Sequence, residues 1–359
     1  MKEAVFLQEV KEIQLLKNAL TLLDWDSSTG MPEKSSPFRG EVEGYLTGLY
    51  FERSIGPVIQ EALAYFETRP EELSELGKLV FEKVKEEYAL NKNVPAERMQ
   101  EYVKVLNQAH TYWLKARAAQ DFGLLEETLT KVVAFQKEFI PYWQKEEKTP
   151  YDVLLNQFEP GMTVEKLDQV FDQVKQGIQE IRTVLAEKGT PPRTDFLSRK
   201  MTKEQQRRFV IGVVEQLGYD FSKGRLDDTV HPFMTALNRN DARITTRWEE
   251  NNFSMATFGV IHEAGHGMYE QNFDPKFDFT PLSEGASMGI HESQSLFNEI
   301  IIGSNRAFWQ KQYPFFQECA EGTFDDIAFE DFYASLKETK ASLIRIDSDS
   351  LTYPLHIII

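Results

Sequence analysis

The stretch FGVIHEAGHGMYEQ, residues 258–271, holds two histidines four positions apart, His262 and His266, with Glu263 directly after the first. Residues four apart lie on one face of an α-helix, about 6 Å apart along its axis, so the two imidazoles can share one tetrahedral ion. Glu263 is rotated off that face and can reach a water on the ion as a general base. A chain of this composition contains the pattern by chance roughly 0.02 times. This favours a helix with a metal centre over two core histidines beside a surface glutamate.

A catalytic metal centre needs a third protein ligand and one open position. The pattern HExxHxxGxxH is excluded because positions 269 and 272 are Tyr269 and Asn272. The segment SEGASMGIHESQS, residues 283–295, offers His291 and Glu292, which are adjacent and point in different directions on a helix. We predict Glu292 as the third ligand, with His291 as a group behind the ligands, a substrate-binding group or a structural histidine. Zn²⁺ is the expected ion, and Co²⁺ or Mn²⁺ would suit the same ligands.

Apolar residues recur every three or four positions over most of the chain, which predicts a mainly α fold. Thr163 and Gly189 bracket one long helix, and Thr202 with Gln205 reads as the capping box of another. The clearest strand is Ala242–Trp248. Further helices are expected over residues 5–23, 72–90, 98–119 and 124–146. With no βαβ alternation or internal repeat, the economical interpretation is one domain over residues 1–359.

The composition limits the partners and the compartment of the protein. A formal net charge of -17 disfavours nucleic acid and anionic membrane surfaces as partners. No apolar run approaches the ~20 residues that span a bilayer, so we expect no membrane segment. The single cysteine, Cys319, cannot form an internal disulfide and is typical of a reducing compartment, so we expect a cytoplasmic protein.

Further motifs lie along the whole chain, in a fixed order. They are LDWDSSTGMP (23–32), the Trp113 and Asp121-Phe122 region, YDVLLNQFEPGMT (151–163), HPF (231–233), DARIT (241–245), HESQS (291–295), IRIDSD (344–349) and LTYPLHIII (351–359). Together with HEAGH, their order and number resemble the carboxypeptidase Taq family of metallocarboxypeptidases, peptidase family M32. The resemblance extends from end to end of the chain.

The resemblance implies His262, His266 and Glu292 as metal ligands and Glu263 as the base. It implies a helical zincin-type fold with a deep groove and a small β-sheet beside the active site, usually as a homodimer. It also implies release of C-terminal amino acids from peptides with broad specificity. Of these expectations, the three ligands and the base agree with the spacing of the residues.

A carboxypeptidase must bind a free C-terminal carboxylate, for which the two-pronged guanidinium of arginine is the natural partner. Arg345, which matches the IRxxA motif of the family, is the leading candidate, and Arg243 with Asp241 in DARIT is the second. His231 in HPF is a candidate donor to the scissile carbonyl or its oxyanion. The DARIT strand could offer its edge to the peptide backbone.

The chain departs from the family pattern in a few places. Leu296 and Phe297 stand where members commonly have Arg and Trp, and Ser348 replaces the Ala of IRxxA. Family members continue past the segment at Ile359 and supply a GxxQDxHW motif, so we expect a domain that is incomplete at its C-terminus. The alternative function is a truncated, catalytically impaired homologue that binds metal or peptide.

Overall fold

The computed structural model describes residues 1–343 and 348–358, and its contacts divide the chain into two compact units. Unit 1 comprises residues 1–160 and 274–284, and unit 2 comprises residues 161–273 and 285–359. The expectation of one domain over residues 1–359 stays a prediction.

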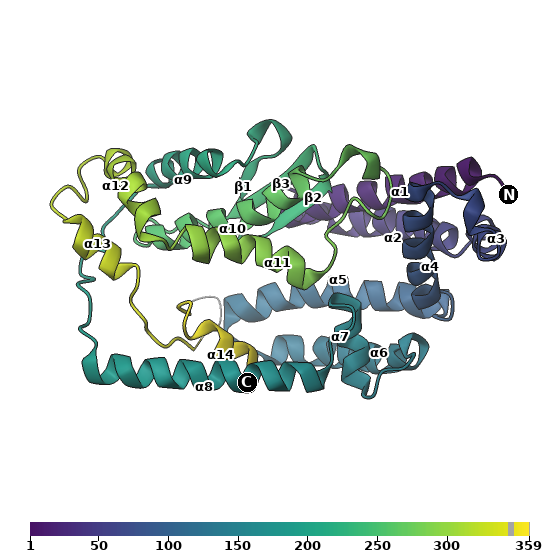
Figure 1. Ribbon diagram of the computed structural model, residues 1–359, viewed down its shortest axis with the longest axis horizontal. Helices are drawn as coiled ribbons and strands as arrows, with labels where there is room; N and C mark the ends of the chain where they lie inside the picture. Colours follow the sequence, from purple (N-terminus) through teal and green to yellow (C-terminus); the bar gives the residue numbers. More distant parts are fainter. Residues whose placement is uncertain (344–347, 359) are drawn as a thin grey trace. The chain divides into compact units, whose positions relative to one another are not determined.

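The α-helices and strands of both units are labelled in Figure 1, and the short 3₁₀ and π-helical turns are named η. Unit 1 contains α1 (Glu3–Thr29), η1 (Glu33–Ser35), α2 (Ser36–Ser54), α3 (Pro57–Phe66), η2 (Pro70–Glu72), α4 (Glu75–Asn91), α5 (Ala96–Ala119), α6 (Gly123–Trp143), α7 (Pro150–Phe158) and η4 (Pro275–Phe277). Unit 2 contains α8 (Val164–Lys188), α9 (Lys203–Leu217), η3 (Phe221–Lys223), β1 (Leu226–Asp228), β2 (Met234–Asn238), β3 (Asp241–Thr246), α10 (Phe253–Gln271), α11 (Met288–Leu296), η5 (Phe297–Ile302), α12 (Arg306–Ala320), α13 (Phe329–Ser335) and α14 (Tyr353–Ile358). The prediction of a mainly helical chain with a small sheet is confirmed.

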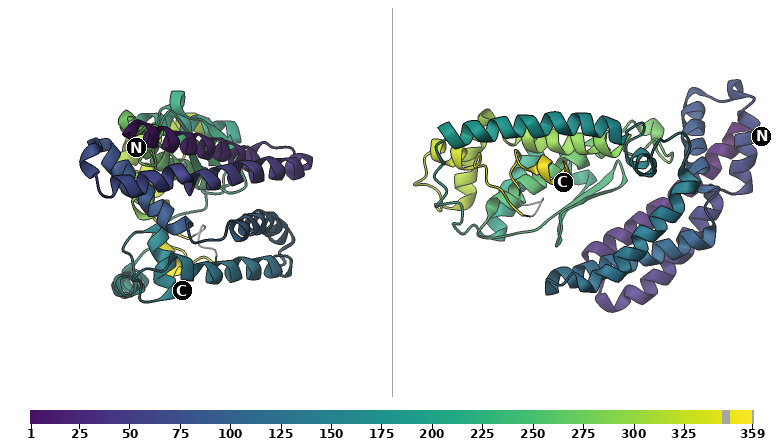
Figure 2. Two further views of the ribbon diagram at one scale, coloured as in Figure 1. Left: turned by 90° about the vertical axis from the view of Figure 1, so that its right-hand side faces the viewer. Right: turned by 90° about the horizontal axis from the view of Figure 1, so that it is seen from below.

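Unit 1 is built of helices and contains two apolar clusters. Phe6 of α1 packs its ring against Phe66 of α3 and Phe81 of α4, with ring centroids 6.0 and 6.4 Å apart. The helices α5 and α6 pack on each other, as α1 and α2 do (Figures 1 and 2). Because aromatic rings bury large apolar areas, such contacts stabilise a unit that has no sheet among its described residues.

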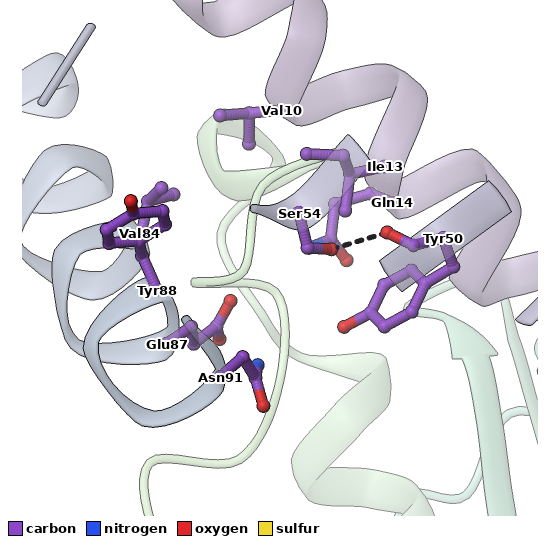
Figure 3. A pocket seen from close by; sticks show the side chains of 9 residues that line it. All are labelled: Val10, Ile13, Gln14, Tyr50, Ser54, Val84, Glu87, Tyr88 and Asn91. Carbon is purple, nitrogen blue, oxygen red and sulfur yellow. Dashed lines mark hydrogen bonds between the residues drawn. The ribbon is translucent and has the colours of Figure 1, made fainter. Parts of the chain in front are cut away.

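A small cavity of about 50 Å³ lies in unit 1 between α1, α2 and α4 (Figure 3). Its polar lining includes Tyr50 of α2 and Glu87 and Asn91 of α4. Burial raises the pKa of the Glu87 carboxyl, and Lys17 partly offsets that rise. The lining contains none of the residues predicted for the metal centre.

The helices predicted in unit 2 begin and end as their capping residues indicate. The Thr163 side chain accepts a hydrogen bond from the Lys166 backbone N–H at the start of α8. Thr202 and Gln205 form the capping box of α9, which ends at Gly218 with a φ of 113°. That left-handed conformation favours glycine.

The core of unit 2 is built on aromatic side chains from α9, α10, α12 and α13. Phe209, Phe253, Trp309, Phe316 and Phe332 are each at most 1% exposed. The Trp309 indole N–H donates a 2.7 Å hydrogen bond to the Gly303 carbonyl, so its polar group is satisfied inside the core. This core fixes α10 between the sheet and the neighbouring helices.

The sheet has the order β1-β3-β2, with β1 parallel and β2 antiparallel to β3. The prediction of a strand in Ala242–Trp248 is confirmed as β3. The hypothesis that this strand offers a free edge does not hold for its Ile244–Thr246 part, because β3 is the central strand and β1 pairs with those residues. The two outer strands, β1 and β2, were not predicted from the sequence.

Across the part of the chain that the structure describes, no helix combines the length and the apolar character needed to cross a membrane.

Candidate metal centre

The HEAGH segment lies within α10, as predicted. Val260, Ile261 and Ala264 are fully buried on the faces of α10 that pack in the core. The sheet supports another part of the helix, where a Cβ on Gly267 would lie 3.5 Å from Ile244 Cγ2 of β3. The histidines therefore project from a helix whose position is fixed by packing along most of its length.

The helix α11 carries Glu292 and lies directly beside α10 (Figure 1). The contact depends on Gly265, the fourth residue of HEAGH. A Cβ at this position would lie 2.7 Å from the Gln294 carbonyl oxygen and 2.7 Å from Ser295 Cα, which is closer than real Cβ atoms come. Because position 265 has no side chain, the α11 backbone approaches closely enough for Glu292 to reach the two histidines.

The structure brings the three predicted ligands together. His266 Nε2 lies 3.3 Å, and His262 Nε2 3.7 Å, from Glu292 Oε2. One ligand atom from each residue lies within 4.8 Å of the others, and no second group of this kind occurs among residues 1–343 and 348–358. A tetrahedral ion with bonds of about 2.0–2.2 Å keeps its ligand atoms roughly 3.3–3.6 Å apart. The residues present therefore fit a divalent ion with His₂Glu ligation.

Glu263 is buried beside this triad, with 7% of its surface exposed. Burial raises its pKa to about 7, His262 opposes the rise, and the carboxylates of Glu292 and Glu299 add to it. A bound cation would favour the charged form of Glu263 and so oppose the effect of burial. A carboxyl group whose pKa lies near neutrality can both accept and return a proton, as a general acid–base catalyst must.

The pKa values of the two histidines are shifted in opposite directions. Burial acts to lower the pKa of His262, but the hydrogen bond to Glu299 and the nearby carboxylates outweigh it, so this pKa is raised. Burial lowers the pKa of His266. Metal binding requires the neutral imidazole. The proton is therefore a stronger competitor of the ion at His262 than at His266.

Two carboxylates that were not predicted from the sequence, Glu299 and Glu270, lie near ring nitrogens of His262 and His291. Glu299 Oε2 lies 2.8 Å from His262 Nδ1. Glu270 Oε1 lies 2.8 Å from Nε2 of His291, whose Nδ1 lies 2.6 Å from His266 Nδ1. Sequence spacing held a signal for Glu270, because it follows His266 by four residues and so lies on the same face of the helix. Glu299 lies on the π-helical turn η5, which α-helical spacing does not describe.

The other predicted residues are placed as follows. His231 is exposed on the loop between β1 and β2. Arg243 on β3 donates from Nε and from one terminal nitrogen to the two carboxylate oxygens of Asp241, both at 2.8 Å. His291 lies beside His266, with the two Nδ1 atoms 2.6 Å apart. Arg345 lies outside the described residues.

Comparisons with known proteins agree with this geometry. Residues 5–359 match the family model described as carboxypeptidase Taq (M32) metallopeptidase. The chain is 44% identical over 357 residues to carboxypeptidase 1 of Bacillus subtilis (strain 168), covering 99% of this chain and 71% of that protein.

Two more distant relatives give the same result. Thermostable carboxypeptidase 1 of Thermus thermophilus is 32% identical over 360 residues, covering 97% of this chain and 70% of that protein. The crystal structure of the M32 carboxypeptidase from Deinococcus radiodurans R1 superposes with a TM-score of 0.90 at 33% identity, covering 98% of this chain and 70% of that chain.

Proposed function

The chain belongs to the carboxypeptidase Taq (M32) family of metallopeptidases, and on that basis we propose that it releases C-terminal amino acids from peptides at a metal centre formed by His262, His266 and Glu292. The observation that carries the site assignment is the convergence of these three side chains from two helices, with their ligand atoms within 4.8 Å of one another. The metallocarboxypeptidase activity follows from the family. The assignment of residues to roles is our proposal.

Held by His262, His266 and Glu292, a divalent ion would supply the Lewis acidity that activates a water molecule and polarises the scissile carbonyl group. Glu263 accepts the proton of that water and returns it to the leaving amine. Its burial supports this role, because the proton then moves between the carboxyl group and the substrate without exchange with bulk water. His231 donates a hydrogen bond to the oxyanion that develops on the substrate.

The substrate carboxylate is bound by arginine. Arg243 supports this role because Asp241 holds its guanidinium group in one orientation, and an oriented fork loses less conformational freedom when it binds a carboxylate. Arg345, the leading candidate from the sequence, is also proposed to bind this carboxylate, on the ground of its motif. We expect Arg243→Lys to raise KM for peptides with a free C-terminus more than it lowers kcat, and an unchanged KM would remove Arg243 from the site.

The identity of the ion, the substrate class and the assembly are proposed from the family and from the ligand chemistry. We propose Zn²⁺ as the ion, with Co²⁺ and Mn²⁺ able to replace it, because two imidazoles and one carboxylate suit all three. We propose peptides with a free C-terminus as substrates and a homodimer as the assembly. The cytoplasm is the proposed location, and the buried, unpaired Cys319 supports a reducing compartment.

The alternative of an impaired homologue that only binds metal or peptide is not favoured. The chain keeps the three proposed ligands and the proposed base, and it matches proteins named carboxypeptidases over 97–99% of its length. It spans 70–71% of the length of those relatives.

The function is tested by mass spectrometry of one peptide in two forms, with a free C-terminus and with a C-terminal amide. We expect stepwise loss of C-terminal residues from the free form only, and no loss after chelation. Glu263→Gln should bind the ion with wild-type stoichiometry and release no residues. Cleavage at internal bonds of the amide would indicate an endopeptidase, and an inactive metal-loaded wild type would support the binding-only alternative.

A further inference from the structure

Each ligand histidine has its Nε2 toward Glu292. The Nδ1 of each histidine lies within hydrogen-bond distance of a different group, which is called its support below. For His262 the support is direct, since its Nδ1 lies 2.8 Å from Glu299 Oε2. For His266 the support passes through another ring, since its Nδ1 lies 2.6 Å from His291 Nδ1. The two histidines are thus held by unlike partners.

The direction of each hydrogen bond follows from the chemistry of the groups. An ionised carboxylate only accepts hydrogen bonds, so His262 Nδ1 carries the hydrogen that is donated to Glu299. The lone pair of a neutral His262 ring is then on Nε2, the nitrogen that faces Glu292. Glu299 therefore selects the tautomer that can bind an ion.

The second support makes the same selection in two steps. Glu270 accepts from His291 Nε2–H at 2.8 Å, which leaves the lone pair of a neutral His291 ring on Nδ1. That nitrogen accepts from His266 Nδ1–H, and the lone pair of His266 is then on Nε2, 3.3 Å from Glu292 Oε2. The proton positions from Glu270 to His266 are consequently linked.

Burial makes Glu270 difficult to explain without this link. The residue is 6% exposed, and a buried charge is costly unless hydrogen bonds or a counter-charge stabilise it. Its hydrogen-bond partner is the His291 ring, which is also held by the edge-on Tyr269 ring with a centroid separation of 5.4 Å. The arrangement of Glu270, His291 and Tyr269 fixes one ring orientation.

Glu299 reaches His262 from an irregular part of the backbone. It lies in η5, a π-helical turn in which the Gly303 N–H donates to the Asn298 carbonyl five residues before it, at 2.8 Å. Such turns are rare and occur frequently at functional sites. The wider turn sets the direction in which Glu299 leaves the α11 segment.

From this geometry we infer that Glu299, and Glu270 acting through His291, are positioning residues that set the metal affinity of two ligands by separate routes. The inference rests on the proposed function, since it assumes that His262 and His266 bind the ion through Nε2. Groups that orient metal ligands typically change metal affinity by about 10–100-fold when they are removed. We expect that range for Glu299→Ala and for Glu270→Ala.

The test is a competition titration of Zn²⁺ between each purified variant and a chromophoric chelator, with the absorption spectrum of the Co²⁺-loaded protein as a second readout. Glu299→Gln and Glu270→Gln keep an acceptor oxygen and should recover most of the affinity lost in the alanine variants. The control is Gln271→Ala, because Gln271 is 4% exposed on the same helix and bonds to the Asp220 backbone. This control should lose stability and keep its Zn²⁺ affinity and Co²⁺ spectrum.

Double variants separate the two routes. Once His291→Ala is present, adding Glu270→Ala should lower the affinity by less than twofold, because the link is already broken. Combining Glu299→Ala with Glu270→Ala should instead multiply the two single losses. Wild-type affinity in the single alanine variants, or equal losses in Gln271→Ala, would overturn the inference. Absence of Zn²⁺ binding by the wild-type protein would instead overturn the proposed function.

Discussion

Replacement of Gly265 by alanine tests how closely α10 and α11 must approach. The new Cβ would lie 2.7 Å from Gln294 O and from Ser295 Cα, whereas ordinary contact begins at 3.4 Å. Both near atoms belong to backbone, so the helices must separate by roughly 0.7 Å, the difference between these distances. The same shift at Glu292 would lengthen its 3.3 Å separation from His266 Nε2 to roughly 4 Å, beyond the spacing of tetrahedral ligands.

Two measurements follow for Gly265→Ala. Overpacking costs about 1–3 kcal/mol, more than the ~1 kcal/mol that alanine gains over glycine inside a helix, so the free energy of unfolding of the metal-free protein should fall. The Zn²⁺ affinity should fall at least about 10-fold in a chelator competition, because one ligand is displaced.

The matched control is Gly177→Ala in α8, where no atom lies within 4 Å of the added Cβ. It should gain up to ~1 kcal/mol of stability and keep wild-type Zn²⁺ affinity. Wild-type stability and wild-type Zn²⁺ affinity in Gly265→Ala would refute the argument that this glycine permits the helix contact.

Thr202→Ala removes the capping bond to the Gln205 N–H, so the free energy of unfolding measured in urea should fall by about 1 kcal/mol. Glu87→Gln tests the buried carboxyl of the unit 1 cavity. Its folded-state pKa is raised above the unfolded value by burial despite Lys17, so its contribution to stability is present at low pH and lost as pH rises through the folded pKa. The variant should therefore unfold at a higher temperature than wild type at pH 8, with the difference shrinking toward pH 4, and an equal melting temperature at pH 8 would contradict this. Chelation of the bound ion should lower the melting temperature, because an ion at 100 times its Kd stabilises the folded state by about 2.7 kcal/mol.

The local parts of the site could be predicted from the sequence. His262, Glu263 and His266 are related by helix periodicity alone, and periodicity does not depend on the rest of the fold. Glu292 lies on a different helix. The sequence offers two adjacent candidates for the third ligand, His291 and Glu292, and the prediction takes the carboxylate. Its distance from the histidines depends on Gly265, whose importance appears only when the two helices are packed.

The parts that were missed depend on tertiary structure or on irregular backbone. Glu299 reaches His262 from a π-helical turn that α-helical periodicity does not describe.

The pair of Asp241 and Arg243 could have been anticipated, because residues two apart on a strand point to the same face. The strands β1 and β2 are 3 and 5 residues long, too short for an alternating pattern to stand out.

The central claim is that His262, His266 and Glu292 hold the ion on which hydrolysis depends. The most direct measurement is an anomalous difference map from crystals of the Zn²⁺-loaded protein, collected on both sides of the zinc absorption edge. The account predicts one strong peak about 2.0–2.2 Å from His262 Nε2, His266 Nε2 and a carboxylate oxygen of Glu292. A peak bound by His291 in place of Glu292, or a strong peak only at other residues, would contradict it.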